Sequence, residues 1–205
     1  LSFQSLLLQV IAPAADWLGE RWSDDELTFS EVTVGAGVLE RVAAALGSDA
    51  DPPLRHGELV VLTAAPGEQH VLPIHLLGEL LREDGWAVHV DPRIEAEELI
   101  ELVANDDVAA VGVTCRDLGR LADFAEFVPH VRAQPVCEDL LFVVGGNPEL
   151  ALRAPRFGAR YGHQLEDFLS IIGSPRRDRV SEVHPNSEPA PTSIHDESPI
   201  SAEGD

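Results

Sequence analysis

Several residue types are missing or rare in this 205-residue sequence. It contains no lysine and no methionine, and only two cysteines and one tyrosine. All fourteen basic residues are therefore arginine, and they stand against thirty-six acidic residues, which gives a formal net charge of −22. Because such a chain repels a phosphate backbone and shows no local basic patch, we expect no direct nucleic-acid binding. The acidity favours a protein partner or a small ligand, and is equally consistent with solubility or life in high salt.

The scarcity of cysteine excludes a disulfide-stapled secreted scaffold. Cys115 and Cys137 are too few for one, and neither belongs to a zinc-type spacing. No apolar stretch is long enough to cross a bilayer, and residues 1–15 have no basic leader region. We therefore expect a soluble cytoplasmic protein that does not contact membranes. Because even an initiator methionine is missing, we also expect that residues preceding Leu1 have been lost and that the amino-terminal domain is incomplete.

Residues 1–47 have a helical pattern. Apolar residues recur at helical spacing from residue 3 to about residue 21, where Pro13 indicates a kink or a division into two helices. A second amphipathic stretch, 25–46, predicts another helix, although Gly35 and Gly37 weaken it. The two stretches predict a helical hairpin, which would form a partial cap over the domain that follows. Residues 47–57, with two prolines and two aspartates, are typical of a linker.

From residue 58 to residue 173, short apolar runs alternate with amphipathic helices, which predicts βαβ units and a parallel sheet. The expected strands are 59–63, 87–90, 108–114, 140–144 and 159–161. The expected helices are 70–83, 94–104, 118–133, 148–152 and 163–172. With right-handed crossovers this is an α/β flavodoxin-like doubly wound sheet of strand order 2-1-3-4-5. Residues 174–205, rich in Pro, Ser and Glu, are expected to form a disordered acidic tail.

The residues with the clearest chemistry follow three of these strands. Glu68 and His70 come after the first strand, Thr114 ends the third, and Gly145 and Gly146 end the fourth. In a parallel sheet these positions share the carboxyl edge, where ligands of open α/β folds bind. A carboxylate that holds one imidazole nitrogen fixes its tautomer and leaves the other nitrogen for a metal. The alternative is ordinary surface solvation at a helix start for Glu68 and His70, and ordinary turn chemistry for the glycines.

These residues carry a resemblance to a known family. The run Pro66–Pro73, then Thr114, then Gly145-Gly146, looks like a divergent form of the cobalamin-binding signature D-x-H-x-x-G, S-x-L, G-G. With Asp84-Gly85-Trp86 and, upstream, Trp22-Ser23-Asp24, Phe29 and Val32–Gly35, it resembles the PpaA/AerR-type regulators of photosynthesis genes in purple bacteria, over roughly residues 22–172. The resemblance implies a flavodoxin-like domain that binds cobalamin, or haem in some members. It also implies that the protein modulates a separate DNA-binding transcriptional repressor.

The resemblance assigns roles to individual residues of this chain. It implies His70 as the lower axial cobalt ligand, Glu68 as its orienting partner, Thr114 as a contact to the nucleotide tail, Gly145 and Gly146 as the platform beside that tail, and Trp22 and Phe29 as caps over the upper face of the corrin. Three departures from the signature argue against conventional insertion of the tail: Glu68 for Asp, Pro73 for Gly and Arg116 for Leu. Val32-Thr33 stands where related photoreceptors carry Glu-His, so we expect no upper histidine ligand.

The leading hypothesis is a cobalamin-binding regulatory protein, antirepressor-like, that is not itself an enzyme. One alternative is a redox sensor of the same fold that binds haem through His70 or Cys115. Another is the corrinoid subunit of a methyltransferase or mutase, which would need a separate catalytic subunit. A ligand-free scaffold that binds partners through its acidic surface is the remaining possibility.

Overall fold

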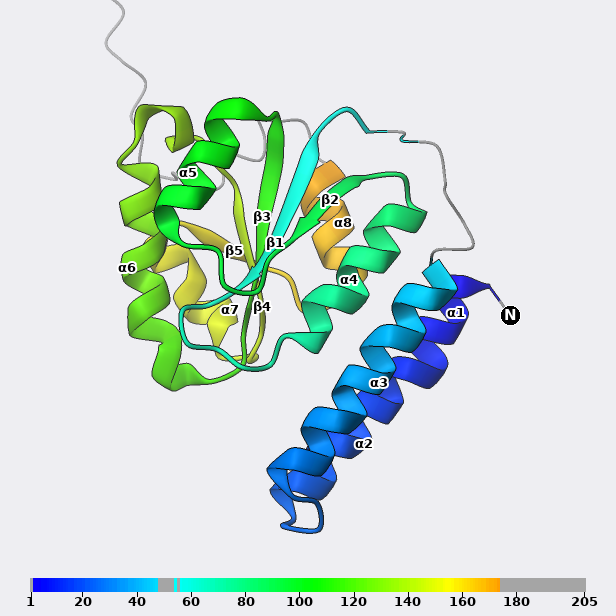
Figure 1. Cartoon of the computed structure of the whole chain (residues 1–205). Helices are drawn as coiled ribbons and strands as arrows, with labels where there is room; N and C mark the ends of the chain where they lie inside the picture. Colours follow the sequence, from blue (N-terminus) through cyan, green and yellow to red (C-terminus); the bar gives the residue numbers. More distant parts are fainter. Residues whose placement is uncertain (1, 48–53, 55, 174–205) are drawn as a thin grey trace, which may run out of the picture.

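A five-stranded parallel sheet with helices on both faces forms the centre of the molecule (Figure 1). The structure is a computed structural model and describes residues 2–47, 54 and 56–173. The strands are β1 (Leu59–Ala64), β2 (Ala87–Val90), β3 (Val108–Cys115), β4 (Phe142–Gly146) and β5 (Ala159–Tyr161). Their spatial order is β2-β1-β3-β4-β5 and every pairing is parallel, which confirms the predicted fold class.

The central strands are buried along almost their whole length because both faces of the sheet are covered. All eight residues of β3 are buried, as expected for a strand packed on both sides by crossover helices. The helices after the hairpin are α4 (Leu72–Glu83), α5 (Ala96–Asn105), η2 (Leu118–Arg120), α6 (Leu121–Arg132), η3 (Pro135–Cys137), α7 (Leu150–Arg153), η4 (Ala154–Phe157) and α8 (Leu165–Gly173). Helices α5, α6 and α7 pack on one face, and α4 and α8 on the other.

The amino-terminal residues form the expected helical hairpin. Its first arm is continuous and consists of α1 (Phe3–Leu6), a π-helical turn η1 (Leu7–Ile11) and α2 (Ala12–Ser23). Pro13 lies in the first turn of α2, directly after the π-helical turn η1. The proline that predicted a kink therefore follows the irregular turn of this helix. The second arm is α3 (Phe29–Gly47). It begins four residues later than predicted because Thr28 and Glu31 form a capping box, in which each side chain accepts from the other residue's backbone N–H.

The hairpin lies beside α4, and its tip projects beyond the carboxyl ends of the strands (Figure 1). Leu7, Ile11 and Ala43 of the hairpin pack against Leu80 of α4 in a small apolar cluster. An ion pair joins the same two elements, with 2.8 Å between Glu40 Oε1 and His75 Nε2. These contacts attach the hairpin to the sheet domain.

Most sequence expectations agree with these elements to within a few residues. The fourth strand was placed at 140–144, but Leu140 and Leu141 precede β4 and are buried as part of the approach to the sheet. The linker predicted at 47–57 and the tail predicted at 174–205 lie largely or wholly outside the described residues. Within those described residues, no helix combines the length and hydropathy needed to cross a bilayer.

Gly112 in β3 provides a test of the packing. A Cβ atom there would lie 2.6 Å from Leu62 Cδ2 and 2.8 Å from Phe168 Cε2, so these side chains, from β1 and α8, make the close approach that the glycine permits. We expect Gly112→Ala to lower the free energy of unfolding by about 1–3 kcal/mol.

Gly37, in α3, has no atom within 4 Å of its Cβ position. Gly37→Ala should raise the free energy of unfolding by roughly 0.5–1 kcal/mol. Urea titration of both variants and the wild type measures these two effects. Equal effects of the two substitutions would contradict this packing.

Candidate ligand site at the carboxyl edge of the sheet

The strand register brings the candidate residues to one edge of the sheet. Ala64 at the end of β1 pairs with Thr114 of β3, and Thr114 pairs with Gly145 of β4. The loop after β1 crosses this edge and carries Glu68 and His70 before α4 begins at Leu72. The expected shared edge of His70, Thr114 and the diglycine is therefore present. It lies at the switch point between β1 and β3, where the chain turns to opposite faces of the sheet.

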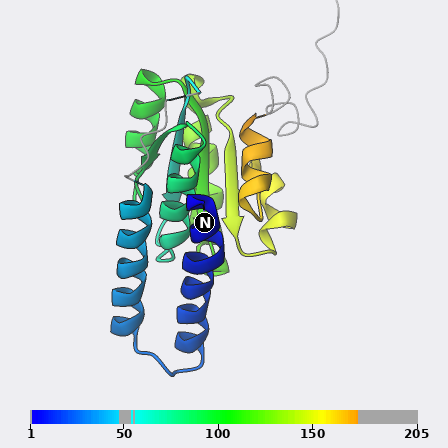
Figure 2. The same ribbon diagram turned by 90° about the vertical axis from the view of Figure 1, so that its right-hand side faces the viewer.

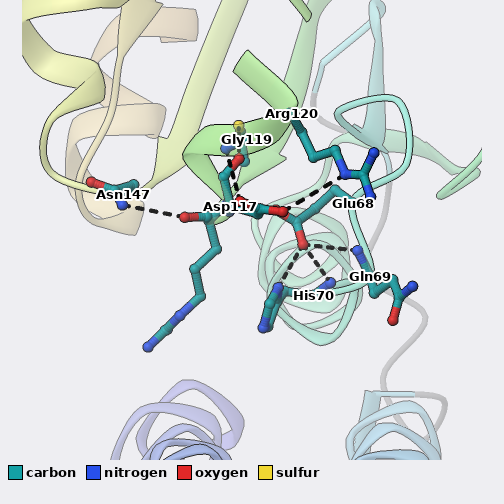
Figure 3. A network of polar contacts seen from close by, with 9 residues as sticks. Glu68, Gln69, His70, Asp117, Gly119, Arg120 and Asn147 are labelled. Carbon is teal, nitrogen blue, oxygen red and sulfur yellow. Dashed lines mark hydrogen bonds and ion pairs between the residues drawn. The ribbon is translucent and has the colours of Figure 1, made fainter. Parts of the chain in front are cut away.

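The carboxylate of Glu68 is the centre of the site (Figure 3). Its Oε1 accepts hydrogen bonds from the backbone N–H groups of Gln69 (2.8 Å) and His70 (2.9 Å), and lies 2.5 Å from His70 Nδ1. Its Oε2 accepts from the backbone N–H groups of Arg116 (2.7 Å) and Asp117 (2.8 Å). One side chain thus joins the loop after β1 to the loop after β3.

These donors determine the charge of Glu68. The side chain is only 1% exposed, and burial by itself would raise its pKa. The hydrogen bonds from the His70 side chain and from the backbone N–H groups of Asp117, His70 and Arg116 outweigh burial and hold the pKa well below its usual range. The carboxylate is therefore ionised at neutral pH and acts only as an acceptor.

One imidazole nitrogen of His70, Nε2, points away from the Glu68 carboxylate. Because Glu68 is an ionised acceptor, the network assigns the imidazole proton to Nδ1 and leaves a lone pair on Nε2. Nε2 has no hydrogen-bond partner among the described residues, and the side chain is 40% exposed. A histidine held by a carboxylate through one nitrogen, with the other nitrogen accessible, is the arrangement found at many metal centres. Glu68 therefore has the orienting geometry that the sequence predicted.

Aromatic side chains of the hairpin tip lie next to His70. The ring centroids of Trp22 and His70 are 6.5 Å apart and their planes are inclined by 48°. Phe29 lies beside Trp22, with 6.4 Å between the centroids. Trp22 and Phe29 remain well exposed despite these contacts. Trp22 and Phe29, the two residues predicted to cap the corrin, are therefore close to His70, the predicted metal ligand, although they come from a separate part of the chain.

Thr114 is buried, and its hydroxyl has no hydrogen-bond partner in the part of the chain that the structure describes. Its backbone carbonyl accepts from the Ala65 N–H (2.8 Å), which holds the Thr114 backbone at the edge of the sheet. A buried hydroxyl without a protein partner is costly. The role that the resemblance implies for Thr114, a contact to the nucleotide tail, stays a prediction.

The two glycines of β4 have a structural role. Gly146 has a φ of +114°, and a Cβ there would lie 2.6 Å from the Cys115 carbonyl oxygen. A Cβ on Gly145 would lie 3.0 Å from the Gly162 carbonyl oxygen. The diglycine thus lets the ends of β3, β4 and β5 approach closely. Whether it also forms a platform for a ligand stays a prediction.

Residues that sequence reasoning missed complete the network. The backbone N–H groups of Arg116 and Asp117 hold Glu68, and the Asp117 side chain accepts from the Gly119 N–H (2.8 Å) at the start of η2. Asn147 donates from its side chain to the Arg116 carbonyl (3.2 Å), which ties the end of β4 to the same loop. The aspartate before a helical turn was visible in the sequence as a cap signal, but backbone donors leave no signal in residue type.

Cys115 is poorly suited to the haem alternative. It is fully buried, and burial, together with the nearby charges of Glu68 and Asp117, raises its pKa to about 11. The thiolate that would ligate iron or react with oxidants is therefore disfavoured.

Comparisons with known proteins agree with this fold. No family model matches the sequence. A curated Rhodobacter capsulatus protein, described as an uncharacterized 20.5 kDa protein in the bchF–crtJ intergenic region, is 27% identical over 128 residues, which are 61% of this chain and 67% of that protein. The chain is thus a distant relative of a protein without an assigned activity.

Two solved structures share the architecture. The monomethylamine corrinoid protein of Methanosarcina barkeri aligns with a TM-score of 0.70 at 11% identity, covering 83% of this chain and 82% of that one. A cobalamin-binding protein of Desulfitobacterium hafniense aligns with a TM-score of 0.50 at 18% identity, with the same coverage of each chain. At these identities the likeness establishes the fold, which is the cobalamin-binding-domain type of α/β fold.

The hydrogen bonds of the Glu68 carboxylate predict how the free energy of unfolding depends on pH. In Glu68→Gln, the amide nitrogen must face a pair of N–H donors, so we expect a loss of roughly 2–4 kcal/mol in the free energy of unfolding at pH 7. Because the pKa of Glu68 is lowered on folding, its contribution is complete above about pH 4.3, the pKa of an unfolded glutamate, and is lost as the pH falls further. The difference between wild type and variant should therefore shrink in acid.

Urea titrations at pH 7, 5 and 3.5 measure this difference. The control is Glu149→Gln, which removes an exposed ion pair with Arg153 and should change stability by less than about 0.5 kcal/mol. A difference for Glu68→Gln that stays constant from pH 7 to pH 3.5 would show that the carboxylate is not the group responsible.

Proposed function

We propose that this chain binds cobalamin through His70 and acts as a regulatory protein without catalytic activity of its own. The observation that carries the proposal is the imidazole of His70, held through Nδ1 by the buried carboxylate of Glu68, with Nε2 free at the ligand-binding edge of the sheet. The hairpin tip next to that imidazole supplies aromatic surface of the kind that covers a flat macrocycle.

The residues present fit such a group. Cobalamin would bring a cobalt ion that accepts a nitrogen ligand, and Nε2 of His70 would be the donor. Glu68 keeps the proton on Nδ1 and fixes the plane of the ring. The unpartnered hydroxyl of Thr114 is available to a polar part of the ligand, and Trp22 and Phe29 would shield it from water on the side of the hairpin.

Two further lines support cobalamin as the ligand. The solved proteins with this fold are described as a corrinoid protein and a cobalamin-binding protein, and the run Pro66–Pro73 with Thr114 and Gly145-Gly146 resembles a divergent form of the cobalamin signature. Haem is the weaker alternative because Cys115 is buried with a raised pKa, so haem would depend on His70 as well. An absorption spectrum of the natively purified protein separates the two, since haem gives a Soret band and cobalamin does not.

The regulatory role rests on the resemblance to the PpaA/AerR-type proteins, which implies a DNA-binding transcriptional repressor as the partner. The acidic charge of −22 supports a protein partner over direct contact with DNA. The shared fold with a methanogen corrinoid protein keeps a second function in view, that of a corrinoid subunit. Transfer of the methyl group from protein loaded with methylcobalamin to a thiol acceptor would favour that second function.

Binding of hydroxocobalamin tests the role of His70. We expect His70→Ala to weaken binding by at least about tenfold, which is about 1.4 kcal/mol, and to abolish the change in cobalt absorbance that accompanies nitrogen ligation. Equilibrium dialysis gives the affinity and the visible spectrum gives the ligation state.

The matched control is His130→Ala, which removes an exposed histidine whose ion-pair partner is Glu97 of α5, on the opposite face of the sheet from α4 and the hairpin. It should leave both readouts unchanged. Urea titration of each variant separates a loss of ligation from a loss of folding. Retention of cobalamin by folded His70→Ala with the wild-type spectrum would eliminate His70 as the ligand.

A further inference from the structure

The helical hairpin carries an apolar surface that the sheet domain does not cover. Val34, Val38 and Val42 of α3 are spaced four residues apart and therefore lie along one side of the helix. All three are exposed, Val34 by 67%. On the other arm, Val10 and Trp17 are also about half exposed. Large exposed apolar side chains gathered on one element are typical of interaction sites rather than of ordinary surface.

The contacts of the two arms show that this surface faces away from the sheet domain. On α3, Glu40 and Ala43 face α4, and Gly35 faces Leu18 of α2, whose Cδ1 lies 2.8 Å from the Cβ position of the glycine. The valines occupy the remaining side of α3. On α2, Leu18 likewise marks the side toward α3.

The two exposed tryptophans of α2 lie on different sides of Leu18, the residue that faces α3. Trp22 contacts His70 on the side of the sheet domain, whereas Trp17 is one residue before Leu18 and about 140° around the helix from Trp22, on the opposite side. Trp17 and the valine stripe thus share one surface. In Figure 2 the two arms lie side by side in front of the sheet domain, and no other described element covers them from that direction. We call Val10, Trp17, Val34, Val38 and Val42 the outer face of the hairpin.

The charges around the outer face are predominantly acidic. Residues 3–47 contain seven acidic residues and two arginines, a net charge of −5. Six of the seven acidic residues lie between Asp16 and Glu31, toward the tip. Arg21 is paired with Glu26 at 2.6 Å and lies over the Trp17 ring, so its charge is largely offset. A partner that buries the outer face therefore meets an acidic rim, and basic residues flanking its own apolar surface complement that rim.

We propose that the outer face is the docking surface for a protein partner that presents an amphipathic helix with basic flanks. An amphipathic helix seats its apolar side chains against the two neighbouring arms, and its lysine or arginine residues face Asp16, Glu20 and Glu31. The surface is separate from the His70 site, so the proposal stands whether or not His70 binds a cofactor. A second copy of this chain is the less suitable occupant because it would bring an acidic rim against an acidic rim, on a chain of net charge −22.

The test uses synthetic amphipathic peptides of about 18 residues, one of leucine and lysine and a matched one of leucine and glutamate. Isothermal titration calorimetry should show binding of the leucine–lysine peptide and none of the acidic one. Val38→Glu should weaken that binding by at least about tenfold. This substitution makes the hairpin more acidic, so attraction of charge alone would strengthen the binding. A gain in affinity for Val38→Glu would therefore overturn the proposal.

Leu152→Glu is the matched control. Leu152 lies on α7 of the sheet domain and is 83% exposed, so the variant adds the same charge away from the outer face and should bind the peptide at least as well as wild type. His70→Ala should also retain peptide binding, and Val38→Glu should retain hydroxocobalamin binding. These two results distinguish a failure of the docking surface from a failure of the cofactor site.

A thiol probe identifies what covers the face in the free protein. Both native cysteines are fully buried, so Val38→Cys introduces the single accessible thiol among the described residues. Its reaction with a chromogenic disulfide reagent should be fast in the free protein and slowed about tenfold by saturating leucine–lysine peptide. Slow reaction in a free monomer would show that the chain covers its own face. Slow reaction in a species that sediments as a dimer would assign the face to a second copy. Either result rejects the proposal.

Discussion

The arrangement of the ligand site depends on the buried carboxylate of Glu68. Removing a carboxylate from water costs several kcal/mol unless its oxygens are fully hydrogen-bonded, and here four backbone N–H groups and one imidazole nitrogen surround it. Two of those N–H groups belong to Arg116 and Asp117 in the loop after β3, which lie 48 and 49 residues after Glu68 in the sequence. The carboxylate therefore joins two loops that are distant in sequence. The same charge that holds the loops together also fixes the tautomer of His70. The position, orientation and tautomer of the His70 imidazole are therefore consequences of one electrostatic requirement.

The hairpin limits how a ligand reaches His70. Aromatic rings in contact have centroids about 4.5–7 Å apart, so Trp22 and His70, at 6.5 Å, already touch. A flat ligand that enters between them has to separate these rings. The hairpin is attached to α4 by a small apolar cluster around Leu80 and by the ion pair of Glu40 with His75. Neither attachment involves Trp22 or His70, so a ligand that separates these two rings need not break either of them.

The sequence predicted the sheet more completely than the site. Runs such as 108–115 are mostly apolar because helices cover both faces of the sheet, so their strands and order follow from pattern alone. The shared edge of Thr114 and Gly145 follows from parallel register. The pairing of Glu68 with His70 was visible because the two residues are neighbours in sequence. The other partners of Glu68 were not, since the N–H groups of Arg116 and Asp117 are backbone atoms whose positions depend on tertiary structure. The contact of Trp22 with His70 likewise depends on where the hairpin docks, which no local pattern specifies.

Helix α2 provides a physical connection between the two proposed surfaces. Trp22 faces His70 and Trp17 faces outward, five residues apart on one continuous helix, which is about 7.5 Å along its axis. Leu18 of the same helix is packed directly on Gly35 of α3, so the two arms of the hairpin are in close contact between these positions. Coupling between sites requires an element whose position both sites influence. Both proposed surfaces belong to the hairpin, since one side of it contacts His70 and the other side carries the exposed valine stripe, so it is the element through which any coupling between them would act.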